Sequence, residues 1–180
     1  ELKTKSIVVA TDGPAAAKLL DDVEPVPVRS VTCAYFAAEQ DPIGKPLLVL
    51  DGVGDGPVNN LCVPSTVAPS YAPPGAHLIS ATVLGIPDQA PSELEAAIRW
   101  QLRKWLGPQV DGGRALRSYR IPHPLPDQPP PALTPAERSA RIAPDIFVCG
   151  DHRDNASING AMVSGRRAAE AVLADSKKAA

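Results

Sequence analysis

The residues best suited to bind a ligand lie near the end of the chain, where Gly150 and Asp151 follow a short apolar run, residues 146–149. If this run is a strand of a parallel sheet, both residues lie beyond its carboxyl end, where ligands of α/β sheets bind. Gly150 has no side chain, so a partner can approach its backbone closely. The two acceptor oxygens of Asp151 suit the hydroxyls of a ribose or ribityl chain, whereas a carboxylate would repel a bare phosphate.

A helix is predicted to follow from about Ser157, and its first backbone N–H groups would attract an electron-rich oxygen. Gly160 and Gly165 lie in this helix, and a glycine inside a helix costs about 1 kcal/mol relative to alanine. Two reasons can offset that cost. One is close contact of the glycines with a flat ligand or another backbone, and the other is tight packing of the helix on a sheet. The stripe predicted to be buried comprises Ile158, Ala161, Met162, Gly165, Ala168, Ala169 and Val172.

Other patterns that carry chemistry are missing from the sequence. There is no G-x-S-x-G nucleophile motif, and the three histidines lack the spacing of metal ligands. The three cysteines are far apart, which predicts buried reduced thiols rather than a disulfide framework or a zinc site. His152, next to Asp151, is expected at most to line the turn. No residue stands out as a general base, so the sequence predicts no metal site and leaves the catalytic residues unknown.

Composition narrows the class of protein. The 180 residues carry a net charge of −2 with no block of like charges, which argues against a nucleic acid or an anionic membrane as the main partner. No apolar run approaches the roughly 20 residues of a membrane span. We expect a soluble intracellular protein, either cytoplasmic or in an organelle such as a plastid. The first residues, "ELKTKS", resemble neither a signal peptide nor a natural start, so a processed or excised piece is expected.

The elements that must position Gly150 and Asp151 come from both ends of the chain. Residues 7–10 form an apolar run followed by a turn and a short helix, and the end of the chain repeats this strand-turn-helix pattern. Two such units cannot form a complete parallel layer, because each parallel strand needs neighbours and covering helices. The sequence therefore predicts that further polypeptide completes the layer.

The middle of the chain has a different pattern. Short apolar or alternating runs separated by turns predict antiparallel strands over residues 28–38, 45–52, 59–65, 77–85 and 114–122. One helix, residues 91–107, interrupts them. Ser92 and Glu95 are expected to form its capping box, and Leu94, Ile98, Leu102 and Trp105 to form its apolar stripe on the sheet. Seven prolines among residues 121–135 predict an extended, semi-rigid crossing segment.

The segment "VCGDHRDNASINGAMVSGRRAAEAVL" resembles the C-terminal flavin-binding motif of the FAD-dependent amine oxidase and phytoene desaturase-like oxidoreductases. The start, "SIVVATDGPAAAKLL", is similar to their strand that returns to the FAD domain, and "NNLCVPSTVAPSYAPPGAHLISATVLG" to their middle segment. The resemblance implies an FAD cofactor and hydride transfer from a C–H bond of a small hydrophobic or amine substrate. The aromatic pair that flanks the substrate of amine oxidases is not recognisable, which favours the desaturase-like branch.

The resemblance also implies roles by position. Gly150 and Asp151 would contact the ribityl-pyrophosphate part of FAD. The residues beside the isoalloxazine ring would be Ser157, Ile158, Asn159, Gly160 and Ala161. Residues 1–22 and 136–180 would belong to the FAD domain, and residues 23–135 to the substrate domain with its proline-rich crossing.

The implied fold class is α/β (α+β), with a partial Rossmann-like layer from both chain ends and an inserted, mainly antiparallel sheet under a helix. The G-x-G-x-x-G fingerprint is missing, so the resemblance predicts activity only with an N-terminal FAD-binding half, from the same gene or a separate chain. The alternative is a non-catalytic binding or assembly subunit derived from this fold.

Overall fold

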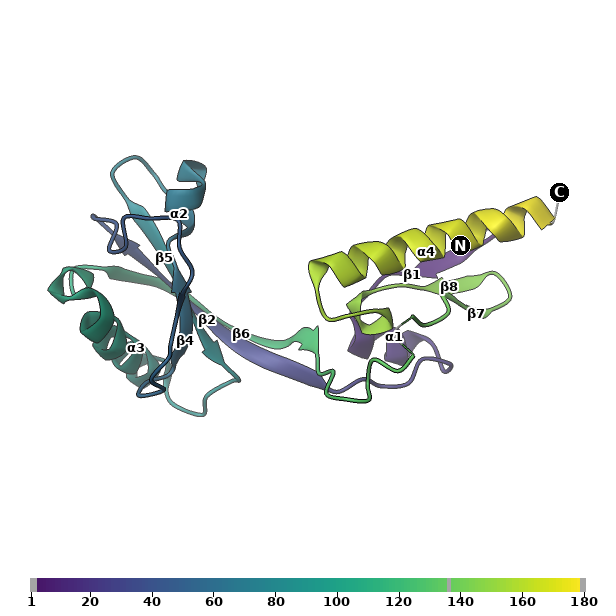
Figure 1. Ribbon diagram of the computed structural model, residues 1–180, viewed down its shortest axis with the longest axis horizontal. Coiled ribbons are helices and arrows are strands. Elements are labelled where there is room, and N and C mark those ends of the chain that lie inside the picture. The colour runs from purple at the N-terminus through teal and green to yellow at the C-terminus, as the bar shows by residue number, and fades with distance from the viewer. Residues whose placement is uncertain (1–2, 136, 179–180) are drawn as a thin grey trace. The chain divides into compact units, whose positions relative to one another are not determined.

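The computed structural model describes residues 3–135 and 137–178. The chain divides into two compact units: an end unit, which joins the residues up to Arg29 with those from His123 onward, and a middle unit, Ser30–Pro122. In Figure 1 the purple and yellow-green ends of the ribbon meet in the end unit, and the middle unit is blue to teal. We describe each unit by itself.

The end unit contains a three-stranded sheet in the order β1-β8-β7. Its strands and helices are β1 Ile7–Val9, α1 Gly13–Leu19, β7 Arg141–Ala143, β8 Ile146–Val148 and α4 Ile158–Lys178. Strand β1 pairs parallel with β8, with Val8 opposite Phe147, whereas β7 pairs antiparallel with β8. The prediction that the two ends of the chain build one α/β layer is therefore confirmed.

Helix α1 begins as its sequence indicates. The Asp12 carboxylate accepts a hydrogen bond from the Ala15 N–H at 2.8 Å, which satisfies one of the unpaired donors of the first turn. Pro14 lies in that turn, where its missing N–H costs nothing. Ala16 is fully buried and forms a small apolar cluster with Val23 and Val148. The helix is thereby fixed beside the carboxyl ends of β1 and β8.

The middle unit is built on a five-stranded sheet in the order β3-β4-β5-β2-β6. Its elements are β2 Val28–Ala38, β3 Val49–Leu50, β4 Val58–Cys62, α2 Pro64–Val67, β5 His77–Leu84, α3 Pro91–Leu106 and β6 Arg114–Pro126. The pairs β2–β5, β3–β4 and β4–β5 are antiparallel, as expected. Three-residue 3₁₀ turns occur at Pro69–Tyr71, Pro108–Val110 and, in the end unit, Asp151–Arg153.

Helix α3 closes one face of this sheet (Figure 1). Leu94, Ile98 and Leu102 from the predicted stripe are buried, and Trp105 packs at the edge of the same core. The sheet contributes the buried residues Ala34, Phe36, Ala38, Val58, Leu61, Ile79, Ala81 and Val83. The buried Gln101 amide is satisfied, since it accepts from the Val58 N–H at 2.7 Å and donates to the Val58 carbonyl at 3.0 Å.

Three local predictions for the middle unit need correction. Helix α3 is not capped by Ser92 and Glu95: it starts at Pro91, and Glu93 accepts from the Ala90 N–H at 3.2 Å. The strand predicted over residues 45–52 shrinks to Val49–Leu50, because Lys45 and Pro46 precede it in a turn. Strand β6 runs on to Pro126, so the first part of the proline-rich segment belongs to a sheet strand.

The buried stripe predicted for α4 is wrong at most of its positions. The side chains of Ile158 and Met162 are 82% and 69% exposed. Ala168, also in the predicted stripe, is buried, and the other buried positions are Gly160 and Ser164, so the three follow one another at spacings of four. The prediction was based on hydrophobicity alone, and it chose a face of α4 against which the described residues do not pack. Among the described residues, no helix is both long enough and apolar enough to cross a membrane.

Candidate functional site

The loop between β8 and α4 lies at the carboxyl ends of the parallel pair β1 and β8. The Cys149 N–H donates to the carbonyl of Val9 at 3.0 Å, which extends the parallel pairing by one residue. Gly150 follows, with its N–H donated to the Ser164 hydroxyl of α4 at 3.2 Å. The loop residues therefore stand where a parallel α/β layer places its ligands.

Gly150 is required by a contact within the chain. Its φ of +150° is one that other residues rarely adopt, and a Cβ there would lie 2.6 Å from the imidazole of His152. A Cβ on Gly13 would lie 3.2 Å from His152 as well. The close partner of the Gly150 backbone is thus the ring of His152, which occupies the space that the sequence left open for a ligand.

His152 is buried, with 1% of its surface exposed. Neither ring nitrogen has a hydrogen-bond partner among the described residues, and Nδ1 is 4.0 Å from a carboxylate oxygen of Asp151. Burial, followed by the positive charge of Arg153, lowers the pKa of this histidine. The imidazole is therefore neutral at pH 7 and fills space between α1 and the loop.

Asp151 keeps 23% of its side chain exposed. It lines a small pocket of about 40 Å³, together with Asp12, Gly13 and His123 of the same unit. Sites that enclose small organic ligands have volumes of about 300–1,000 Å³. The described residues offer Asp151 as an accessible acceptor but do not by themselves enclose a space of flavin size.

The other five predicted site residues are Ser157, just before α4, and the first four residues of the helix. The Ser157 hydroxyl accepts from the Gly160 N–H at 2.9 Å, and the Ser157 carbonyl accepts from the Ala161 N–H at 3.0 Å. The N–H groups of Ile158 and Asn159 have no acceptor among the residues that the structure describes. These two backbone donors of the turn are therefore available to an electron-rich atom of a ligand.

The two glycines of α4 differ. A Cβ on Gly160 would come closer than 3.0 Å to the carbonyl oxygen of Asn155, so the loop folds back against this glycine. A Cβ on Gly165 would meet nothing within 4 Å. Contact with another backbone therefore explains Gly160, one of the reasons that the sequence allowed, whereas no contact among the described residues explains Gly165.

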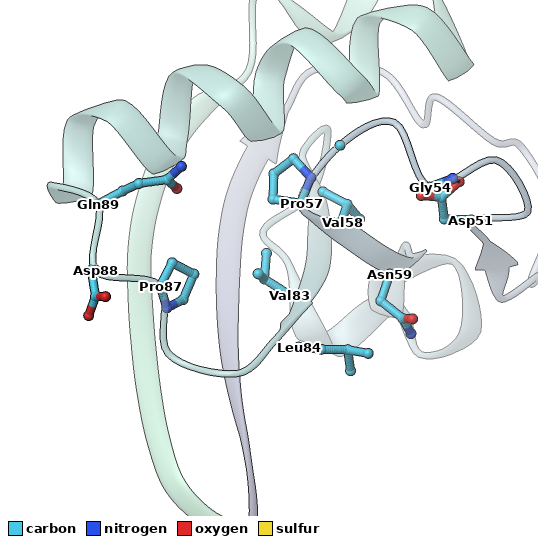
Figure 2. Close-up of a pocket in the computed structure, with 11 residues that line it drawn as sticks. Asp51, Gly54, Pro57, Val58, Asn59, Val83, Leu84, Pro87, Asp88 and Gln89 are labelled. Carbon is cyan, nitrogen blue, oxygen red and sulfur yellow. Dashed lines mark hydrogen bonds between the residues drawn. The ribbon is translucent and has the colours of Figure 1, made fainter.

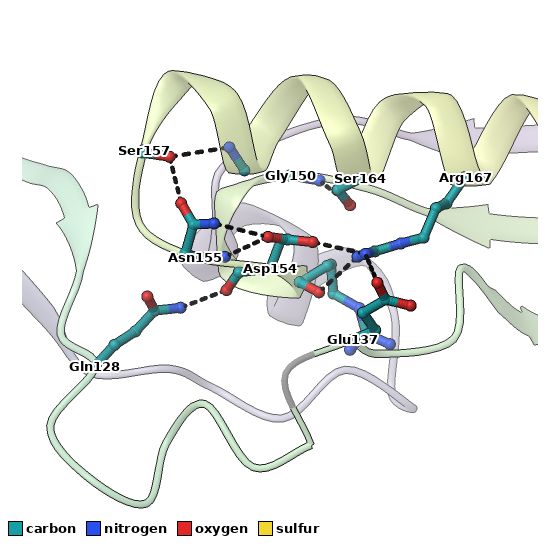
Figure 3. A network of polar contacts seen from close by, with 10 residues as sticks. Gln128, Glu137, Gly150, Asp154, Asn155, Ser157, Ser164 and Arg167 are labelled. Carbon is teal, nitrogen blue, oxygen red and sulfur yellow. Dashed lines mark hydrogen bonds and ion pairs between the residues drawn. The ribbon is translucent and has the colours of Figure 1, made fainter.

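A polar network holds the loop from the outside (Figure 3). Arg167 of α4 pairs with Asp154 at 2.6 Å, and the Gln128 amide bonds to the loop backbone. Burial, followed by the positive charges of Arg138 and Arg167, lowers the pKa of Arg153. Sequence reasoning missed these residues, because scattered arginines and a glutamine between prolines form no motif. Their contacts appear only once the loop is folded.

The middle unit presents a second candidate surface, the sheet face opposite α3. The pairing places Cys33 opposite Thr82, and Tyr35 opposite Ser80. Asn60 of β4 lies on the same face and donates to the Thr82 hydroxyl at 3.3 Å. Tyr35 also packs edge-to-face on Tyr119 of β6, at 5.9 Å between ring centroids. This face is polar but carries no charge at these positions.

A recess of about 570 Å³ lies at one end of the middle sheet (Figure 2). Val58, Val83 and Leu84 form its apolar wall, and Asp51 is the acidic residue at one side. The Asp51 carboxylate accepts from the backbone N–H groups of Gly54 and Val53, which lower its pKa. One Asp51 oxygen thus holds the turn, and the other accepts from the Gln101 amide at 3.2 Å. None of the predicted site residues lines the recess.

Residues 1–173 match the family model of the flavin-containing amine oxidoreductases. The match covers nearly the whole chain, so the protein belongs to this family. A comparison with curated proteins returns no match.

Solved structures share the fold at low sequence identity. An oxidoreductase from Methanosarcina mazei superposes with a TM-score of 0.61 and 17% identity, over 89% of this chain and 38% of its own. Reduced UDP-galactopyranose mutase gives 0.65 and 13%, over 84% and 37%. A protein from Pyrococcus furiosus gives 0.53 and 16%, over 88% and 35%. This chain thus spans little more than a third of the length of these proteins.

Family and fold agree with the resemblance found in the sequence. The α/β fold class is confirmed, and the family is one of flavin enzymes. The roles of individual residues are not tested by these comparisons and stay predictions. Among the described residues, no group of histidines, cysteines and carboxylates is arranged to hold a metal ion.

Proposed function

We propose that this chain is the C-terminal part of an FAD-dependent oxidoreductase, which oxidises a C–H bond of its substrate by hydride transfer to the flavin. The β8–α4 loop forms one wall of the cofactor site, and a dinucleotide-binding half supplies the remainder. The observation that carries the proposal is the placement of Asp151 and the free N–H groups of α4 at the carboxyl ends of the parallel strands β1 and β8.

The residues of the loop fit parts of a flavin nucleotide. The Asp151 carboxylate accepts from the hydroxyls of the ribityl chain. The N–H groups of Ile158 and Asn159, with the dipole of α4 behind them, stabilise negative charge on the flavin ring. The flavin supplies the hydride acceptor, and the polypeptide supplies binding, orientation and electrostatics. The hydrogen bonds of Ser157 to Gly160 and Ala161 fix the conformation of the turn. The missing side chain of Gly150 allows the ring of His152 to lie against its backbone.

The need for another half is supported by apolar surface on the end unit. Ile7 and Val8 of β1, an edge strand of the described sheet, are 51% and 45% exposed. Ile158 and Met162 on α4 are exposed as well. Parallel strands are normally covered on both faces. The length of the solved relatives leaves room for such a half.

In this proposal the middle unit binds the substrate. Its open sheet face combines uncharged polar groups with Tyr35 and Tyr119, which suits a small hydrophobic or amine molecule. We also propose the functional boundaries: an FAD domain from residues 1–22 and 136–180, and a substrate domain from residues 23–135. The proposed location is intracellular. The compact units divide instead after Arg29 and after Pro122.

A second candidate is a non-catalytic assembly subunit. It is favoured by the small volume beside Asp151, about 40 Å³, and by the internal partner of Gly150. In that case, the loop would be a structural element only. The two candidates differ in whether the purified complex contains flavin.

The test is reconstitution. The chain is mixed with a dinucleotide-binding half, and bound flavin is measured by visible absorbance and by native mass spectrometry. We expect a yellow complex with the mass of one FAD. Asp151→Asn should weaken FAD binding about tenfold, since a charge-assisted hydrogen bond is worth roughly 1.5–3 kcal/mol. The matched control, Asp88→Asn in the middle unit, should bind normally. A folded, colourless complex containing only polypeptide would favour the assembly subunit.

A further inference from the structure

The loop proposed to bind the flavin is held by two side chains from opposite sides, Gln128 and Arg167. We propose that these two residues are the positioning residues of the cofactor loop, acting through the loop residues 153–156. The link between this loop and the flavin rests on the proposed function. Whether the two residues hold the loop in place can be measured without flavin.

Gln128 grips the loop backbone with both ends of its amide. Its Nε2 donates to the Asp154 carbonyl at 2.8 Å, and its Oε1 accepts from the Ala156 N–H at 2.7 Å. A planar amide that bonds to two backbone groups at once fixes their separation and orientation. Gln128 therefore sets the conformation of the loop immediately before Ser157, the residue that caps α4.

Arg167 grips the same loop from helix α4. One guanidinium nitrogen donates to the Asp154 carboxylate at 2.6 Å, and a second donates to the Arg153 carbonyl at 3.1 Å. Asp154 also accepts from the Asn155 N–H at 2.8 Å, and this bond, with the pairing to Arg167, lowers the pKa of Asp154. The carboxylate is thus held in its charged form against Arg167, with 12% and 18% of the two side chains exposed.

The loop segment that Gln128 and Arg167 hold, residues 153–156, lies in the sequence between the two groups of residues that would contact the flavin. Asp151 and Gly150 precede the gripped segment, and the free donors of Ile158 and Asn159 follow it. The carbonyl of Asn155, at the centre of the segment, packs on Gly160. A shift of the segment would therefore move the acceptor and the donors relative to each other.

The proline-rich segment has a specific task in this arrangement. Gln128 is followed by Pro129, Pro130 and Pro131, and the backbone just before it is anchored where the Asp127 N–H donates to the Pro27 carbonyl at 2.6 Å. Proline restricts the conformations of the unfolded chain, so less entropy is lost when the segment is ordered. The sequence suggested a crossing segment, and the structure adds that it carries a loop-positioning side chain.

Hydrogen exchange of the backbone amides, measured by NMR on the full chain, tests the holding of the loop. Gln128→Ala should speed exchange of the Ala156 amide about fivefold, since a net hydrogen bond is worth about 1 kcal/mol. Gln128→Glu retains the acceptor for Ala156 but loses the donor to Asp154, so its effect should be smaller at Ala156. Arg167→Gln should speed exchange at Asn155.

The control is Arg166→Gln, one residue away on the same helix. Arg166 is 70% exposed and forms a loose pair with Glu170 at 3.8 Å. It should leave exchange in the loop unchanged. Unchanged exchange at Ala156 and Asn155 in the Gln128 and Arg167 variants would overturn the proposal, whatever happens to flavin binding.

The reconstituted complex tests the link to the cofactor. Gln128→Ala and Arg167→Gln should raise the dissociation rate of FAD about tenfold and shift the flavin reduction potential, as expected when the loop donors move. Ile98→Val, a mild core change in the middle unit, provides a comparable loss of stability and should change neither. If all three variants act alike, the effect is one of stability and the proposal is wrong. If the wild-type complex binds no flavin, the proposed function fails, and amide exchange alone decides whether the grips hold the loop.

Discussion

The middle unit and the end unit are stabilised in different ways. In the middle unit, one helix and a five-stranded sheet enclose a continuous apolar core that includes Leu61 and Ile98, both fully buried. In the end unit, the apolar cluster is small and centres on Ala16, Val23 and Val148, while much of the loop is held by arginine and amide hydrogen bonds. The middle unit thus has a continuous apolar core, whereas the end unit has only a small apolar cluster, and both units also expose large apolar residues, such as Leu50 and Ile158.

The difference separates two tasks in one chain. Apolar burial is non-directional and tolerates small shifts, so it suits a rigid support. Hydrogen bonds to backbone groups fix distances and angles, so they suit a loop whose donors must meet a ligand. Under the proposed function, the end unit acquires its missing apolar contacts from the dinucleotide-binding half. The following predictions test this contrast.

The largest effect is expected from Leu61→Ala in the middle core. Removing a fully buried leucine side chain costs the transfer free energy and leaves a cavity, which together amount to about 2–5 kcal/mol. Chemical denaturation of the chain, followed by tryptophan fluorescence, measures the loss, since Trp100 and Trp105 are both in α3. Leu50→Ala, at a leucine that is 66% exposed, is the control and should cost much less. Similar losses for both variants would contradict the view that the middle unit has its own core.

An intermediate effect is expected from the glycines of α4. Gly160→Ala would force the Asn155 carbonyl away, and overpacking of this kind costs about 1–3 kcal/mol. Gly165→Ala meets nothing and should stabilise the helix by about 0.5–1 kcal/mol. Thermal unfolding of the two variants measures these opposite signs. A destabilised Gly165→Ala chain would show that its side of the helix is occupied within the chain itself.

The same pair of variants sharpens the comparison in the reconstituted complex. If the dinucleotide-binding half or the flavin packs against Gly165, the alanine that stabilises the free chain should weaken the complex. The change of sign between free chain and complex is specific to a surface that lies open until the partner binds. Equal stabilisation in both would mean that Gly165 faces solvent throughout.

The sequence predicted what depends on local pattern. The parallel pairing of the two chain ends and the stripe of α3 follow from periodicity and turn residues, and the structure confirms them. The prediction of the buried face of α4 was mostly wrong. A hydrophobic stripe identifies the face of a helix that needs a packing partner, but it does not show whether this chain supplies that partner. The partner of Gly150 was missed for a related reason: glycine permits close approach, and only folding reveals that His152 is what approaches.

The smallest effect is a pH dependence that originates in His152. Burial, then Arg153, lowers the pKa of this histidine in the folded chain, and Asp151 and Asp12 only partly oppose them. Below about pH 6.5 the unfolded chain takes up a proton that the folded chain does not. The free energy of unfolding therefore decreases as the pH is lowered, by at most about 1.4 kcal/mol per pH unit, until the pKa of His152 in the folded chain is reached.

Denaturant midpoints at pH 7.5 and pH 5.5 measure this slope. His152→Leu should flatten it by removing the titrating group, although the variant itself is expected to be less stable because the ring fits between Gly13 and Gly150. The control is His123→Gln, at an exposed histidine of the same unit, which should preserve the slope. If the wild-type slope survives in His152→Leu, other groups cause it. The imidazole would then not be held neutral by burial, and the end unit would be more open to water than its contacts indicate.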